Sequence, residues 1–207
     1  MFADRIDAGQ QLATALAGYA SAPATIVLGI PRGGVVVAAQ VAERLGLPLD
    51  IVFAAKVGAP GNAEYAVGAV TADGQLLANP EAGLDEANLE RAAGPAREKI
   101  ARQLTSLRGV RPPLQVSGMT AIVVDDGLAT GLTARAAVAY LRRQSAARIV
   151  LAVPVAAGAS AAVLRREVDE LVAVEIPYSF HAVGQFYARF PQTDDAEVRG
   201  LLGVSAA

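Results

Sequence analysis

The sequence has no cysteine, no tryptophan and a single histidine, His181. Without cysteine there is no disulfide framework, no thiolate zinc site and no cysteine nucleophile. Aromatic residues make up only 5% of the 207 residues. Half of them nevertheless gather near the C-terminus, beside His181: Tyr178, Phe180, Phe186, Tyr187 and Phe190. A core built from Ala, Val, Leu and Ile does not need such a cluster, so its position asks for an explanation.

The sequence also has little net charge and no long uninterrupted apolar run. A net charge of -2 gives no reason to expect a nucleic-acid partner. The longest apolar stretch, residues 149–164, is broken by Pro154 and Gly158 and is too short to cross a membrane. The N-terminal residues lack the basic start and apolar centre of a signal peptide. We therefore expect a cytoplasmic protein with no membrane partner.

Short runs rich in Val and Ile alternate with helical patterns. The runs are typical of strands buried on both faces, and they cover residues 25–30, 49–55, 120–126, 148–155 and 169–176. Helices are predicted over 34–45 and 132–144. This alternation predicts an α/β fold: a Rossmann-like, three-layer parallel sheet with helices on both sides. We expect one domain, 1–207, with a helical insertion at about 84–108 where charged residues concentrate.

Ligands of parallel sheets bind beyond the carboxyl ends of the strands, so these positions are the candidate site. Pro31-Arg32-Gly33-Gly34 follows the first predicted strand, and Lys56 follows the second. The third is followed by the longest polar motif, within IVVDDGLATGLT at residues 122–133.

The IVVDDGLATGLT motif suits a phosphorylated sugar. Its glycines let backbone N–H groups approach a phosphate at the start of a helix, where threonine hydroxyls can add hydrogen bonds. Asp125 and Asp126 would repel a phosphate, so they suit sugar hydroxyls or a hydrated Mg²⁺. The alternative is that Asp126 caps a helix and that Gly127 and Gly131 are turn residues. No lysine follows Gly131, which excludes a P-loop, and GIPRGG lacks the spacing of a dinucleotide fingerprint.

The motif resembles the phosphoribosyl diphosphate (PRPP) signature of type I phosphoribosyltransferases. VLGIPRGGVVVAAQVAERL, KVGAPGNAEYAVGAV and FHAVGQFY resemble a predicted phosphoribosyltransferase subfamily across most of the chain. The resemblance implies a Mg²⁺-dependent transferase of nucleotide salvage. Such an enzyme would move the 5-phosphoribosyl group from PRPP to an acceptor, a nucleobase or another aromatic molecule, and release pyrophosphate.

The resemblance also implies residue roles on the donor side. Asp125, Asp126, Arg32 and Lys56 would be the catalytic residues. The two aspartates would hold the ribose 2- and 3-hydroxyls and Mg²⁺, directly or through water. The 5-phosphate would be held by Gly127, Leu128, Ala129, Thr130, Gly131 and Thr133. Pyrophosphate would be held by Arg32, Gly33 and Lys56, in a loop that often contains a cis peptide in this family. In isolation the Arg32 loop also fits an ordinary turn, and Lys56 a solvated lysine.

On the acceptor side, residues 177–207 resemble a hood over the sheet. The resemblance assigns acceptor contacts to Phe180, Val183, Phe186 and Tyr187. Arg189 stands near the position where related enzymes have an acidic residue, which argues against guanine-like recognition. The alternative is that these rings cover the end of the sheet or a homodimer interface.

Other polar residues have less specific assignments. Asn62 and Glu64 either line the acceptor side or form a surface turn. Arg108 and Arg111 flank either a loop that closes over PRPP or a solvated connector. Two other functions stay open: a PRPP- or nucleotide-binding regulator without turnover, and a hydrolase of a phosphorylated sugar.

Overall fold

A five-stranded parallel sheet forms the centre of the molecule. The computed structural model describes residues 1–108, 112 and 114–204, except for the side chains of residues 63 and 64. The sheet has the order β2-β1-β6-β7-β8. Its strands are β1 (Thr25–Gly29), β2 (Leu49–Ile51), β6 (Thr120–Val124), β7 (Arg148–Val155) and β8 (Glu170–Glu175). All four neighbouring pairs are parallel. The chain therefore has the α/β fold that the sequence predicts.

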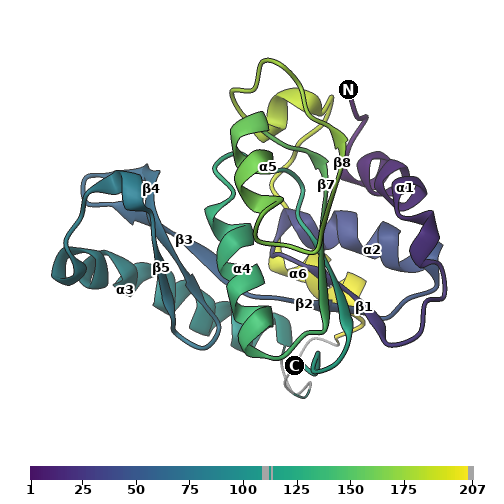
Figure 1. The fold of residues 1–207 in the computed structure, drawn as a ribbon, viewed down its shortest axis with the longest axis horizontal. Coiled ribbons are helices and arrows are strands. Elements are labelled where there is room, and N and C mark those ends of the chain that lie inside the picture. Colours follow the sequence, from purple (N-terminus) through teal and green to yellow (C-terminus); the bar gives the residue numbers. More distant parts are fainter. Residues whose placement is uncertain (109–111, 113, 205–207) are drawn as a thin grey trace.

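Helices cover both faces of this sheet (Figure 1). One face carries α1 (Arg5–Ala15) and α2 (Gly33–Leu45), and the other α4 (Leu132–Arg143) and α5 (Gly158–Leu164). Successive residues of β1 alternate between two cores: Ile26 and Leu28 pack with residues of α4, whereas Val27 packs with α1 and α2. Because both faces are buried, the strands are continuously apolar. The alternating strands and helices thus form the three expected layers.

A second sheet lies outside the main one, and it was not predicted from the sequence. It is antiparallel and contains β3 (Ala54–Ala59), β4 (Asn62–Thr71) and β5 (Leu76–Ala78). The strand predicted over residues 49–55 is therefore wrong, because β2 ends at Ile51 and β3 begins at Ala54. Val52 and Phe53, between the two strands, are buried. The apolar run continues from one sheet into the next, so composition gave no sign of the break.

Helices occupy the range predicted for a helical insertion, 84–108, and pack on this second sheet. After the short helix η2 (Pro80–Ala82), α3 spans Glu86–Gln103 and continues into a π-helical turn, η3 (Leu104–Arg108). The Asp85 carboxylate caps α3 by accepting the Asn88 N–H at 2.8 Å. One face of α3 is buried against β3 and β4. We call β3, β4, β5 and α3 the side unit, which projects from the main sheet in Figure 1.

The C-terminal region divides between two places. The chain after β8 passes through η4 (Val183–Phe186) and returns to the N-terminus, where the Phe2 N–H donates to the Phe186 carbonyl at 2.7 Å. The following helix, α6 (Asp195–Leu202), packs instead against α2 and η3. Within the predicted hood range, only the part before α6 lies beside the N-terminus; we call residues 177–192 the hood. The remaining short helix, η1 (Ala17–Tyr19), follows α1. No helix in the described part of the chain is long and apolar enough to cross a membrane.

Candidate functional site

The loop between β6 and α4 is held in place by its neighbours on the sheet. The Leu128 side chain is buried, and its N–H donates to the Val155 carbonyl at 2.9 Å. The Ser160 hydroxyl donates to the Ala129 carbonyl at 2.5 Å. Gly131 adopts a left-handed conformation, with φ of 72°, immediately before α4, a position that favours glycine. These contacts fix the loop around the first turn of the helix.

The same loop presents a row of unused backbone donors. Among the described residues, none of the N–H groups of residues 129–134 has a hydrogen-bond partner. A hollow of about 140 Å³ adjoins them, lined by residues 127–134 together with Asp125 and Val183. Unpaired N–H groups and the positive end of a helix dipole favour a phosphate. The structure thus gathers the predicted phosphate residues around one hollow: Gly127, Leu128, Ala129, Thr130, Gly131 and Thr133.

Asp125 and Asp126 directly precede this loop, and the buried Arg5 forms an ion pair with Asp126. The Arg5 Nε donates to the Asp126 carboxylate at 2.8 Å, while its Nη1 donates to the Pro191 carbonyl at 2.7 Å. Burial, reinforced by the charge of Asp126, raises the pKa of Asp125 well above its usual range. Burial also raises the pKa of Asp126, although Arg5 opposes this rise. Arg5 was missed from the sequence because it lies far from the motif along the chain.

The Pro31-Arg32-Gly33-Gly34 loop packs directly on this pair. The Pro31–Arg32 peptide is cis, as the resemblance implies. A Cβ atom at Gly33 would overlap the Asp126 carboxylate, and one at Gly34 would lie 2.9 Å from the Asp125 Cα. Only glycine therefore allows the two loops to approach so closely.

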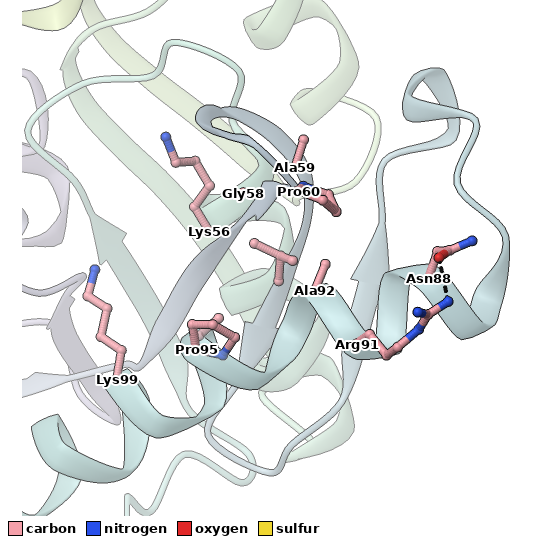
Figure 2. Close-up of a pocket in the computed structure, with 11 residues that line it drawn as sticks. Lys56, Gly58, Ala59, Pro60, Asn88, Arg91, Ala92, Pro95 and Lys99 are labelled. Carbon is pink, nitrogen blue, oxygen red and sulfur yellow. Dashed lines mark hydrogen bonds between the residues drawn. The ribbon is translucent and has the colours of Figure 1, made fainter.

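Three cations lie beside this loop, one of which was not predicted. Arg32 precedes α2 and forms a long ion pair of 3.7 Å with Asp195. Lys56 was expected at the end of a main-sheet strand, but it lies in β3 of the side unit. It lines a cavity of about 670 Å³ between β3 and α3, together with Lys99 of α3 (Figure 2). Burial lowers the pKa of Lys99, as do the positive charges of Arg32 and Lys56.

The hood touches residues 127–133, which we call the phosphate loop, from the other side. A Cβ atom at Gly127 would lie 2.6 Å from the Val183 side chain, so hood and loop are in close contact. The rings of Phe180 and Phe186 are half-buried, with centroids 5.2 Å apart. Tyr187 is buried instead, and its hydroxyl donates to the Asp126 carbonyl at 2.6 Å. Of the predicted acceptor rings, only Phe180 and Phe186 are thus partly accessible.

The remaining candidates lie outside this cluster. Arg108 is buried and forms two hydrogen bonds with the Asp50 carboxylate, at 2.8 and 3.3 Å. Asn62 begins β4, and its side-chain oxygen accepts the Tyr65 N–H at 3.3 Å. His181 is exposed and contacts the Ser179 hydroxyl at 3.3 Å. Arg111 and the side chain of Glu64 lie outside the described residues.

The comparisons with known proteins agree with this geometry. A family model described as a phosphoribosyl transferase domain matches residues 4–189. The chain belongs to the phosphoribosyl transferase family. The match includes the phosphate loop, the acidic pair and most of the hood.

Two relatives are similar over almost all of this chain. A candidate phosphoribosyl transferase of Mycobacterium tuberculosis is 41% identical over 98% of the chain. The chain spans only about half the length of that relative, 46%. A crystal structure of a Thermus thermophilus protein is 43% identical, covers 97% of both chains and superposes with a TM-score of 0.82.

The donor set at the acidic pair consists of oxygen ligands, which fit Mg²⁺. Asp125 and Asp126 offer carboxylate oxygens, and the described residues hold no group of three His, Cys, Asp or Glu side chains that could enclose an ion. Mg²⁺ is commonly bound by one or two carboxylates, with water and substrate oxygens completing its shell. The pair therefore suits a metal ion that a phosphorylated substrate shares.

Proposed function

We propose that this chain is a Mg²⁺-dependent phosphoribosyltransferase that uses PRPP as donor and an aromatic molecule as acceptor. The observation that carries the proposal is the row of unpaired N–H groups at residues 129–134 beside the Asp125–Asp126 pair. The N–H groups suit a phosphate and the carboxylates suit a diol, and these are the two recognition elements of a 5-phosphoribosyl group. The family match supports the same chemistry.

The order of the strands supports separate places for the acceptor and the diphosphate. The hood follows β8 at one edge of the main sheet, and the side unit follows β2 at the other edge. The phosphate loop and the Arg32 loop follow β6 and β1, which lie between them. An acceptor at the hood would then approach ribose C1 from one side. The diphosphate, held at Arg32 and Lys56, would leave from the other side, as a displacement at C1 requires.

In this reaction the bond from ribose C1 to the diphosphate oxygen breaks, and an acceptor atom bonds to C1 as it loses its proton. Negative charge develops on the departing diphosphate. Arg32 and Lys56 would stabilise this charge, while the loops hold C1 in place. Mg²⁺, held by Asp125 and Asp126, would supply additional positive charge to stabilise the departing diphosphate. The half-buried Phe180 and Phe186 would hold a flat acceptor by stacking.

The test is PRPP binding measured by calorimetry with and without MgCl₂, followed by a screen of aromatic heterocycles for pyrophosphate release. We expect Asp125→Asn combined with Asp126→Asn to weaken PRPP binding by about 100-fold, since it removes two charge-assisted contacts. Asp73→Asn, on the side unit, is the matched control. PRPP binding that is unaffected by the double substitution would refute the proposal. Binding without release by any acceptor would favour a regulator, and PRPP loss without an acceptor would favour a hydrolase.

A further inference from the structure

The cavity between β3 and α3 is a built pocket with polar residues at both ends. One side is formed by residues 56–60 of β3 and its following turn, and the other by one face of α3. That face presents side chains three or four residues apart, from Asn88 through Ala92 and Ala96 to Lys99. The middle of the pocket is apolar, so its charged groups define where an ion could bind.

The charged groups at the two ends differ in their partners. At one end, the Arg91 Nη2 donates to the Asn88 amide oxygen at 2.7 Å. At the other end, Lys56 and Lys99 extend in the same direction, away from Arg91 (Figure 2). Arg91 is thus hydrogen-bonded within its own helix, whereas Lys56 and Lys99 point away from it.

Lys99 differs from the other cations of α3. Arg97 pairs with Glu90 at 2.7 Å, and Arg102 pairs with Glu98 at 3.6 Å. Among the described residues Lys99 has no carboxylate partner. Its electrostatic neighbours are instead two cations, Arg32 and Lys56. Arg32 itself pairs with Asp195 at 3.7 Å. Since no carboxylate among the described residues pairs with Lys99, an anion bound beside Lys99 would offset its repulsion from these cations.

We propose that Lys99 is a third cationic contact for the diphosphate group of the donor, which it reaches from the side unit across the β3–α3 pocket. This inference rests on the proposed function. It gives α3 a role in the site: the helix brings a cation to the diphosphate that the main sheet does not supply. Arg32, Lys56 and Lys99 then come from three segments, the loop before α2, β3 and α3, and meet at the leaving group.

The experiment uses three ligands with MgCl₂: inorganic pyrophosphate, PRPP and ribose 5-phosphate, which lacks the diphosphate. We expect Lys99→Gln to weaken pyrophosphate and PRPP binding by about tenfold, the loss of one charge-assisted contact. Ribose 5-phosphate binding should stay within about twofold. Arg102→Gln, exposed on the same helix, is the matched control and should change none of the three. Lys99→Arg should restore pyrophosphate binding to within about threefold, because it restores the charge.

The outcomes separate this inference from the proposed function. Unchanged pyrophosphate and PRPP binding in Lys99→Gln would overturn the inference and leave the function standing. Equal weakening of all three ligands would also overturn it, because it would indicate a structural role for Lys99. Failure of the unmodified chain to bind PRPP would instead refute the function on which the inference rests.

Discussion

The phosphate loop and the diphosphate side of the site are built in opposite ways. The loop at residues 127–133 is one continuous segment that offers mainly backbone N–H groups. The proposed diphosphate side would be assembled from side chains of Arg32, Lys56 and Lys99, which are distant along the chain. A continuous loop keeps its geometry through local contacts. A group of side chains from separate elements depends on how those elements pack. Substitutions should therefore affect the two sides differently.

The largest effect is expected where the two sides meet. Gly33→Ala would place a Cβ atom against the Asp126 carboxylate and 2.7 Å from the Arg5 Nε. We expect a loss of about 3 kcal/mol in the free energy of unfolding, as for overpacked sites, with a large loss of PRPP affinity. Urea unfolding and calorimetry would measure the two.

Gly18→Ala is the control for Gly33→Ala, because no atom lies within 4 Å of the added Cβ. It should change stability by less than about 1 kcal/mol. If Gly33→Ala were equally mild, the close packing of the two loops would not be required.

The second effect concerns Arg5, which connects the acidic pair to the hood. Besides its bonds to Asp126 and Pro191, its guanidinium lies 3.8 Å from the centre of the Phe190 ring. Arg5→Met would leave the Asp126 carboxylate poorly compensated in a mostly buried site. We expect it to cost about 2–3 kcal/mol of unfolding free energy.

Arg189→Met tests the same kind of ion pair at the surface. Arg189 pairs with Asp4 at 2.7 Å, but its side chain is 75% exposed. Its substitution should cost less than about 1 kcal/mol. If both substitutions changed the free energy of unfolding equally, burial would not determine how much the Arg5–Asp126 pair contributes to stability.

The contrast between the two sides also explains what the sequence could reveal. The phosphate loop could be proposed from the sequence because its glycines, threonines and aspartates follow a strand without interruption. Lys99 and Arg5 carry no such signal: each is a charged residue on a helix, and only tertiary packing places it near the site. The main sheet was predicted because its strands are apolar throughout. The change of sheet between Ile51 and Ala54 was missed for the same reason.

A smaller effect, on pH dependence, should be confined to the diphosphate side. Burial, Arg32 of the α2 loop and Lys56 of β3 lower the pKa of Lys99, so this lysine loses its proton earlier than a solvated one as pH rises. An anion binds the charged form, which means that pyrophosphate affinity falls as pH rises through the lowered pKa. Arginine keeps its charge over this range. The ratio of pyrophosphate affinities, Lys99→Arg over unmodified protein, should therefore already grow at pH values below the ordinary lysine pKa of about 10.4. A constant ratio would show that the Lys99 charge does not act on the ligand.

The smallest effect is expected for the removal of a threonine hydroxyl from the phosphate loop. Thr130 and Thr133 line the hollow, but six backbone N–H groups line up beside them at residues 129–134. If the main chain provides most of the binding, Thr130→Val should weaken ribose 5-phosphate binding by only about threefold, the net value of one neutral hydrogen bond. Thr130→Pro removes an N–H donor instead and should weaken binding by tenfold or more, because a backbone donor to a charged phosphate is lost. Circular dichroism would check that both variants fold. Equal effects of Val and Pro would mean that the hydroxyl, not the backbone, recognises the phosphate, and that both sides of the site rely on side chains after all.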